Sequence, residues 1–212
     1  MSQDCIQGPY VATCPIILAS GSPRRKDFLI ELGLDFTIVL PDDAVEPKPV
    51  AGESPADYVC RAAEAKAMAV AQSLKGNQDG PSPLIIAADT VVALKDEIMG
   101  KPQSDDDALG MLSRLAGQSH AVISAVCLVL PDGGMHTFYA NTKVTMWDVP
   151  RDALAAYVAT GEPRDKAGSY AIQGIGAFLV RAIEGSWTNV VGLPVAELVV
   201  YLREQGLIEA SK

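Results

Sequence analysis

The sequence has few of the residues that build zinc sites and disulfide frameworks. Its 212 residues include four cysteines and two histidines. No two cysteines form a C-x-x-C pair, whereas a zinc site needs sulfur and imidazole ligands at short, clustered spacings. The sequence therefore predicts no zinc centre, and we interpret the thiols as buried or incidental.

Basic residues and long apolar runs are also scarce. Lys and Arg total 17 against 26 Asp and Glu, so the formal net charge is −9. Non-specific nucleic-acid binding depends on basic side chains that neutralise phosphates, so this class is excluded. The longest apolar stretches, 16–19 and 121–130, are too short to cross a bilayer, which argues against a membrane partner. Residues 1–11 contain no Lys or Arg and thus lack the basic start of a secretory signal, so we expect a cytoplasmic location.

Hydrophobic residues make up 49% of the chain, which is enough for a sizeable core. Short apolar segments alternate with segments of helical periodicity, and this pattern predicts an α/β fold with a mixed sheet. Asp132-Gly133-Gly134 separates two apolar segments and predicts a hairpin. We expect helices at 23–32, 55–74, 105–116, 151–160 and 194–204, and strands at 16–19, 36–40, 84–88, 91–94, 121–130, 135–144 and 177–183. No linker divides the chain, so we expect one domain over 1–212, with 1–15 as an N-terminal extension.

The first candidate site is the segment Ser20-Gly21-Ser22-Pro23-Arg24-Arg25, called the phosphate loop below, where a strand turns into a helix. Free backbone N–H groups and the positive end of the helix dipole favour an anion at such a turn. Ser22 can donate a hydroxyl hydrogen bond, and Arg24 and Arg25 can bind phosphate oxygens bidentately. Two arginines in a first helical turn oppose the dipole unless an anion lies among them. The alternative is a capped helix with solvated arginines.

Two further segments carry charged residues beside apolar strands. Asp89 follows an apolar strand directly, and ligands of α/β folds bind near strand ends. Its carboxylate could hold a divalent cation or orient a water, or it could simply open a turn. Gly100-Lys101-Pro102 could bring Lys101 to a phosphate, although such turns are also common on surfaces.

The remaining candidates are single residues. Gln173, in the charged loop 161–174, could hydrogen-bond a base or a metal-bound water, and the alternative is a solvated loop. Glu46 lies in the long loop 41–53 and could add a second carboxylate to a metal. Lys66 is by default a solvated helix lysine, and we interpret His120 as a structural hydrogen-bonding residue.

Taken together and in this order, these segments resemble the Maf family of nucleotide pyrophosphatases. The resemblance extends over about residues 16–205. The matching pieces are Leu18-Ala19-Ser20-Gly21-Ser22-Pro23-Arg24-Arg25, Ala88-Asp89-Thr90-Val91-Val92, Gly100-Lys101-Pro102, Gly117-Gln118-Ser119-His120-Ala121-Val122, Asp165-Lys166-Ala167-Gly168, Ile172-Gln173-Gly174 and Val190-Val191-Gly192-Leu193-Pro194.

The resemblance implies an elongated fold with a mixed, mostly parallel-cored sheet flanked by helices, and two lobes around a deep cleft. It implies hydrolysis of a nucleoside triphosphate between the α and β phosphates, with Mg²⁺ or Mn²⁺ as cofactor. It also implies a homodimer and a house-cleaning role that is linked to septum formation. Asp89-Thr90 resembles the branch of the family that acts on dTTP and UTP.

The family's site residues are carried over by position. Ser22, Arg24 and Arg25 match the phosphate-binding motif, and Asp89 matches the proton acceptor. Glu46, Lys66, Lys101 and Gln173 match further active-site positions, and Arg24, Thr90 and Gln173 fall where substrate choice is assigned. Two small departures from the family pattern, Ser124-Ala125 and Ala171, concern the shape of the pocket.

From these matches we expect a shared site. The phosphate loop and Asp89 would meet around one polyphosphate, with Lys101 on the phosphates and with Glu46 and Asp89 binding the metal or activating water. Two alternatives remain open. A nucleotidyltransferase is one, because Leu18–Arg24 faintly resembles the glycine-rich loop of those enzymes. A nucleotide-sensing regulator of cell division without turnover is the other.

Overall fold

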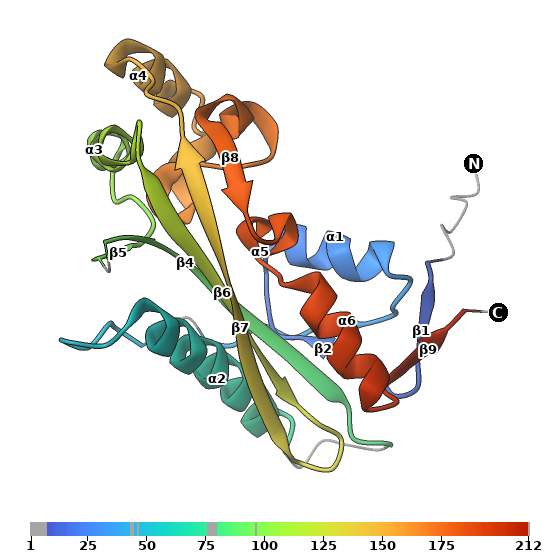
Figure 1. Ribbon diagram of the computed structural model, residues 1–212. Helices are drawn as coiled ribbons and strands as arrows, with labels where there is room; N and C mark the ends of the chain where they lie inside the picture. Colours follow the sequence, from blue (N-terminus) through green and yellow to red (C-terminus); the bar gives the residue numbers. More distant parts are fainter. Residues whose placement is uncertain (1–7, 43–44, 46, 76–79, 96, 212) are drawn as a thin grey trace.

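A central sheet runs through the protein in the computed structural model, which describes residues 8–42, 45, 47–75, 80–95 and 97–211. Among the described residues the sheet has seven strands in the order β3-β2-β4-β6-β7-β8, with β5 paired to β4 (Figure 1). The strands are β2 (Ile16–Leu18), β3 (Thr37–Ile38), β4 (Leu84–Leu94), β5 (Glu97–Met99), β6 (Ser119–Val129), β7 (Met135–Met146) and β8 (Val180–Glu184).

The strand directions confirm a mixed sheet but not a mostly parallel one. Among the described pairs, β2–β3 and β2–β4 are parallel, and all pairs from β4 through β8 are antiparallel. The expectation of a mostly parallel core is therefore wrong. The reason lies after Leu94, where the chain turns through Lys95 (φ 50°) and runs back on β4 as β5 before the next helix. The predicted hairpin at Asp132-Gly133-Gly134 is confirmed and joins the two long strands β6 and β7.

Helices cover both faces of the sheet (Figure 1). Even-numbered residues of β4 such as Leu84 and Ile86 face one helix layer, whereas Ile85 and Ala87 face α2 on the other side. This follows from the alternation of side chains along a strand. One face of the sheet carries α1 (Pro23–Glu31), α5 (Trp187–Val191) and α6 (Val195–Glu204), and the other face carries α2 (Pro55–Ser73). Each of these two helix layers forms a hydrophobic core with the sheet. A third hydrophobic core lies at the far end of the sheet under α3 (Asp105–Leu115) and α4 (Arg151–Ala159).

Local capping chemistry explains where the helices begin and end. The Ser54 and Ser104 hydroxyls accept hydrogen bonds from the first turns of α2 and α3, as serine N-caps do. Gly33 and Gly161 end α1 and α4 with positive φ. The strand predicted at 177–183 begins only at Val180, because Gly174–Leu179 forms a 3-10 helix. Two shorter 3-10 turns, Glu162–Asp165 and Ala167–Ser169, precede it.

The two ends of the described chain lie side by side. β1 (Tyr10–Ala12) pairs antiparallel with β9 (Ile208–Ala210) in a small second sheet. Within the described ranges, no helix combines the length and the apolar character that a membrane crossing requires. The single domain over 1–212 and the deep cleft stay predictions.

Candidate active site

The candidate site lies along an edge of β4 that lacks a continuous neighbour. On that edge β2 pairs with Leu84–Ile86 and β5 pairs with Val92–Leu94. Residues 87–91 lie between these two ladders, and no described strand pairs with them on this side. The sequence suggested that Asp89 directly follows the end of a strand, and the structure shows that it does not. It lies inside a long strand, and the neighbouring strand β2 ends instead because the chain turns into α1.

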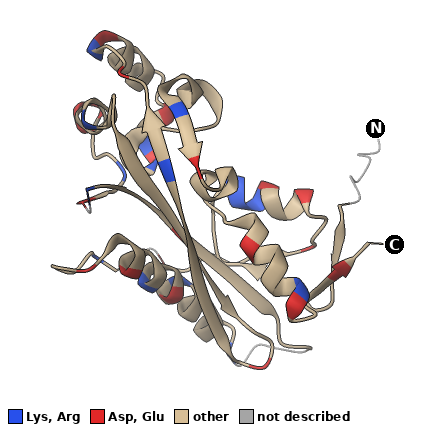
Figure 2. Cartoon of the chain, in the orientation of Figure 1, with Lys and Arg blue, Asp and Glu red and all other residues tan. Residues whose placement is uncertain are grey.

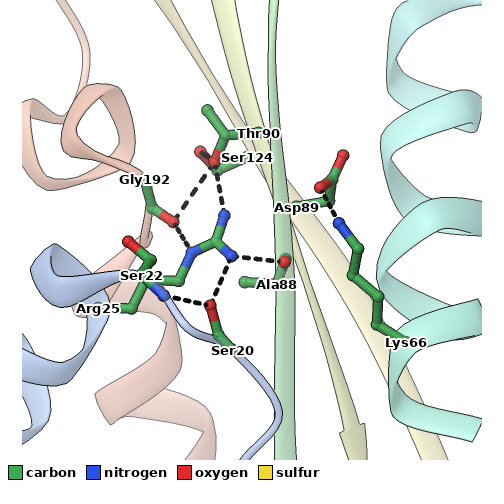
Figure 3. A network of polar contacts seen from close by, with 9 residues as sticks. All are labelled: Ser20, Ser22, Arg25, Lys66, Ala88, Asp89, Thr90, Ser124 and Gly192. Atoms are coloured by element: carbon green, nitrogen blue, oxygen red, sulfur yellow. Dashed lines mark hydrogen bonds and ion pairs between the residues drawn. The ribbon is translucent and has the colours of Figure 1, made fainter. Parts of the chain in front are cut away.

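Arg25 occupies this unpaired edge from the α1 side (Figure 3). Its Nη1 donates to the Ala88 carbonyl oxygen at 2.7 Å and to Ser20 Oγ at 3.0 Å. Its Nε donates to the Gly192 carbonyl oxygen at 2.9 Å, and its Nη2 donates to Thr90 Oγ1 at 3.1 Å. The guanidinium thus connects the phosphate loop, β4 and the turn before α6.

The start of α1 is strongly basic (Figure 2). Ser22 holds the N-cap position, its N–H donates to Ser20 Oγ at 3.3 Å, and its side chain makes no capping bond. Arg24 Nε donates to the Val191 carbonyl oxygen at 3.2 Å. Burial raises the pKa of Asp165, but the Lys166 ammonium, with help from Arg24, lowers it overall. Arg24 is therefore electrostatically coupled to the loop 161–174.

Asp89 and Lys66 form an ion pair on the α2 side of the same strand (Figure 3). Lys66 Nζ lies 2.5 Å from Asp89 Oδ1, and Asp89 is 8% exposed. Lys66 lies four residues from both Ala62 and Val70, which are buried, and Val70 packs in the core between α2 and the sheet. Residues spaced by four share a helix face, so Lys66 points at the sheet and is not the solvated lysine expected by default.

Arg25 and Asp89 thus approach neighbouring positions of β4 from opposite faces. Thr90 belongs to the Arg25 network and Asp89 to the Lys66 pair, since successive strand side chains alternate. The structure brings the phosphate loop and Asp89 to the same short segment without turning their side chains toward each other. A substrate that contacts both has to cross the unpaired edge 87–91.

The other predicted residues lie at the margins of this segment. The Gly168 N–H donates to the Gly100 carbonyl oxygen at 3.1 Å, and Gly168 packs against Val92, so the loop with Lys101 lies near the end of the edge. Lys101 and Gln173 are exposed, and no described hydrogen bond joins either side chain to Asp89 or Arg25. Glu46 lies outside the described residues. Within the described ranges, no cluster of three His, Cys, Asp or Glu side chains could hold a metal ion.

Comparison with known proteins decides the family. A family model described as "Maf-like protein" matches residues 15–205. The chain belongs to the Maf family. Among its relatives, the dTTP/UTP pyrophosphatase of Nitratidesulfovibrio vulgaris is 64% identical over 204 residues, which cover 96% of this chain and 94% of the relative. The dTTP/UTP pyrophosphatase of Oleidesulfovibrio alaskensis is 48% identical, over 97% of this chain and 92% of the relative.

A solved structure shares the fold of this Maf protein. The HAM1 protein from Coxiella burnetii aligns with a TM-score of 0.50 at 16% identity, over 91% of this chain and 100% of the other. At that identity the likeness concerns the architecture alone.

In this Maf chain, the sequence indicated Ser124 only as a departure that concerns the shape of the pocket, and sequence reasoning missed Asn189 behind it. Thr90 Oγ1 lies 2.8 Å from Ser124 Oγ, which donates to the Asn189 carbonyl oxygen at 2.8 Å. Asn189 is fully buried, and its amide donates to the Val122 carbonyl oxygen and to Thr142 Oγ1, both at 2.9 Å. Gly192, which the sequence indicated only as part of the matching piece Val190-Val191-Gly192-Leu193-Pro194, accepts the Arg25 bond through its carbonyl oxygen. The available signal was an asparagine beside the apolar run Val190-Val191, because a buried amide must find partners.

Proposed function

We propose that this chain hydrolyses dTTP and UTP between the α and β phosphates, releasing the nucleoside monophosphate and pyrophosphate. The observation that carries the proposal is the unpaired segment 87–91, which has a basic helix start on one face and an acidic group, Asp89, on the other. The proposal is supported by the two relatives of 64% and 48% identity, which carry the name dTTP/UTP pyrophosphatase.

The basic groups match the charge of the substrate. A triphosphate carries several negative charges, so its hydrolysis depends on positioning and on charge neutralisation. Arg24, the Ser22 hydroxyl and the first backbone N–H groups of α1 would bind the phosphate chain. Lys101 would reach it from the neighbouring loop, and Gln173 would contact the base or a water.

Asp89 is the candidate general base for the attacking water. Its Oδ1 is occupied by the Lys66 ammonium at 2.5 Å, so the ion pair fixes the orientation of the carboxylate. The second oxygen, Oδ2, has no hydrogen-bond partner in the described part of the chain and would either accept the proton or bind the divalent cation. General base catalysis by a carboxylate positioned in this way typically raises the reaction rate about 10²–10⁴-fold.

A divalent cation, Mg²⁺ or Mn²⁺, is part of the proposal. Protein sites hold Mg²⁺ through one or two carboxylates together with substrate phosphates. Asp89 supplies one such carboxylate, so the donor chemistry fits, and Glu46 would supply a second. When bound, the cation would neutralise phosphate charge. A homodimer and a house-cleaning role linked to septum formation stay predictions from the family, and a cytoplasmic location stays a prediction from the sequence.

A product assay tests the proposal. The protein is incubated with dTTP, UTP and a panel of other nucleoside triphosphates in Mg²⁺ or Mn²⁺, and monophosphate and pyrophosphate are quantified. We expect equimolar products from dTTP and UTP with water as the only acceptor. Pyrophosphate release that requires an added acceptor would indicate a nucleotidyltransferase, and binding without product would indicate a nucleotide sensor. Either result would reject the proposed hydrolysis.

A further inference from the structure

The two arginines of the phosphate loop differ in what their guanidinium groups contact. Arg25 donates to four protein acceptors through all three of its nitrogens. Arg24 donates from Nε to the Val191 carbonyl oxygen, and its two terminal nitrogens have no hydrogen-bond acceptor among the described residues. A guanidinium has five N–H donors in a fixed plane, so the bonds of Arg25 determine its position closely.

Arg25 also continues the hydrogen-bond ladder of the sheet. The Ala19 N–H donates to the Ile86 carbonyl oxygen at 2.8 Å, which is the last such bond from the β2 side. Carbonyls two residues apart on a strand point to the same edge, so the Ala88 carbonyl oxygen is the next acceptor. Arg25 Nη1 donates to it at 2.7 Å. The guanidinium therefore occupies the place where a further strand residue would pair with β4.

The same side chain is coupled to the buried core behind the strand. Thr90 Oγ1 accepts from Arg25 Nη2 and lies against Ser124, which is itself bonded to Asn189. Ser124 and Asn189 are both fully buried. The bonds of Arg25 thus hold Ser20 in place relative to this buried polar network. Ser20 in turn accepts the Ser22 N–H inside the phosphate loop (Figure 3).

We propose that Arg25 is a positioning residue that fixes the phosphate loop and the open edge of β4, and that Arg24 is the arginine that binds the phosphate chain. This inference rests on the proposed hydrolysis of dTTP and UTP. Arg25 acts on the substrate through Ser20 and Ser22 and through the shape of the 87–91 edge. Arg24 belongs to the first turn of α1, where a phosphate is favoured, and its terminal nitrogens have no acceptor among the described residues.

Conservative substitution separates the two roles. Lysine remains a good phosphate ligand as a point charge, so it replaces an arginine whose function is charge. Its single nitrogen cannot reach the Ala88 and Gly192 carbonyls and Thr90 Oγ1 together, so it does not replace an arginine whose function is its planar set of bonds. Arg24→Lys should thus recover much of the loss in Arg24→Ala, whereas Arg25→Lys should be as defective as Arg25→Ala.

The experiment compares these four variants by dTTP kinetics, by inhibition with pyrophosphate and by the Tm of the free protein. For both Arg25 variants we expect kcat to fall about tenfold or more, which corresponds to the loss of a hydrogen bond to a charged group, and a lower Tm. For Arg24→Ala we expect an unchanged Tm, a raised KM for dTTP and weaker inhibition by pyrophosphate. Lys26→Ala, an exposed basic residue of the same helix turn, is the matched control and should leave all three quantities unchanged.

A gentler variant keeps the test valid if the Arg25 variants do not fold. Thr90→Val preserves the shape and the Arg25 charge but removes the acceptor of Arg25 Nη2 and, with it, the bond between Thr90 Oγ1 and Ser124. We expect kcat to fall severalfold at temperatures far below the Tm, while KM for dTTP changes by less than about twofold. A purely structural role would lower the Tm without this split between kcat and KM, and that result would contradict the proposal.

One result would contradict the assignment of Arg25, and another would contradict the proposed function. If Arg25→Lys keeps the wild-type kcat and Tm while Arg25→Ala raises KM for dTTP and weakens inhibition by pyrophosphate, Arg25 is itself the phosphate ligand and the inference is wrong. Failure of the wild-type protein to release pyrophosphate from dTTP or UTP would reject the proposed function instead. The two failures are distinguishable, because the second is seen in the wild-type protein before any substitution is made.

Discussion

At the scale of single residues, the ion pair between Lys66 and Asp89 is the chemical centre of the account. Two oppositely charged groups that are largely withdrawn from solvent stabilise each other, and removing the Asp89 charge takes this contact away from the Lys66 ammonium. The pair therefore serves both the fold and the orientation of the proposed base.

Asp89→Asn tests this pair. We expect turnover of dTTP to fall about 10²–10⁴-fold, because the amide cannot accept the proton of the attacking water. We also expect a lower Tm, because the Lys66 ammonium loses its carboxylate. Steady-state kinetics and thermal unfolding measure the two effects, with Asp27→Asn on the exposed side of α1 as control. A folded Asp89→Asn protein with near-normal pyrophosphate release would remove Asp89 from the chemistry.

The backbone conformation at Gly174, next to Gln173, favours glycine at this position. Its φ is +77°, and a Cβ placed there would collide with Glu162 Oε1. The Glu162 carboxylate accepts the N–H groups of Ile175 and Gly176 at 2.9 and 2.8 Å, which fixes this turn.

Gly174→Ala should therefore lower the free energy of unfolding by about 1–3 kcal/mol, because it adds both backbone strain and a collision. Gly110→Ala is the matched control. Gly110 lies inside α3 with open space around its Cβ position, so alanine there should stabilise the protein by about 0.5–1 kcal/mol. Denaturant unfolding measures both. Equal effects of the two substitutions would contradict this description of the Gly174 turn.

Residue types were easier to predict from the sequence than their contacts. The local pattern of Ser22, Arg24 and Arg25 at a strand-to-helix turn, and Asp89 in an apolar run, identified these positions. The partners of Arg25 could not be predicted, because its bond to Gly192 joins residues 167 positions apart. Likewise, a lysine in a helix is expected by default to be exposed to solvent. The burial of Lys66 follows only from how α2 packs on β4.

At the scale of elements, the buried pair His120–Tyr170 joins β6 to the loop before the Gly174–Leu179 3-10 helix. His120 Nε2 lies 2.7 Å from Tyr170 Oη, and His120 is 4% exposed. Burial lowers the pKa of His120 to about 4 from its usual 6.5. The folded protein therefore holds the imidazole neutral over a range in which the unfolded chain protonates it.

Stability should accordingly depend on pH through this element. Because the unfolded state binds the proton more readily, the free energy of unfolding is highest above about pH 6.5 and falls as the pH drops toward 4, by about 3 kcal/mol in total. Denaturant unfolding at pH 7.5 and pH 4.5 measures the slope in the wild-type protein and in His120→Gln, which should lose this contribution. Identical slopes in the two proteins would argue against a buried neutral His120.

Predicting the elements from the sequence succeeded where local chemistry determines them. The helix ranges 55–74 and 105–116 and the Asp132-Gly133-Gly134 hairpin depend mainly on neighbouring residues, such as the serines that cap these two helices. Strand direction in the sheet depends on the reversal at Lys95 and on β5, a three-residue strand too short to show a periodic pattern. The expectation of parallel pairing therefore failed at this turn, while the mixed character of the sheet was correct.

At the scale of the whole molecule, segments from both ends of the chain complete the site. The phosphate loop follows β2 near the N-terminus, and Val191 and Gly192, which bind its arginines, precede the last helix. β4 lies between them and carries Asp89 to the α2 face. Cleavage by such an arrangement depends on charge neutralisation along the whole phosphate chain, to which the protein contributes only part.

Removal of divalent metal should therefore abolish turnover. We expect EDTA to stop pyrophosphate release from dTTP and UTP, and excess Mg²⁺ or Mn²⁺ to restore it, because Asp89 can hold such a cation together with substrate phosphates. Unfolding monitored in parallel controls for loss of structure. Full activity in EDTA would exclude the metal from the mechanism and leave charge neutralisation to the basic side chains.

We expect one triphosphate to cross the unpaired edge of β4 and to contact both faces of the strand. The most direct measurement is a crystal structure with a dTTP analogue whose α–β bridge resists hydrolysis, grown with Mg²⁺. We expect phosphates beside the 87–91 segment, with Arg24 on the γ or β phosphate and the α phosphate within reach of Asp89 through water or metal. Arg25 should remain bonded to Ala88 and Gly192. An analogue bound away from this edge, or touching only one face of β4, would contradict this expectation.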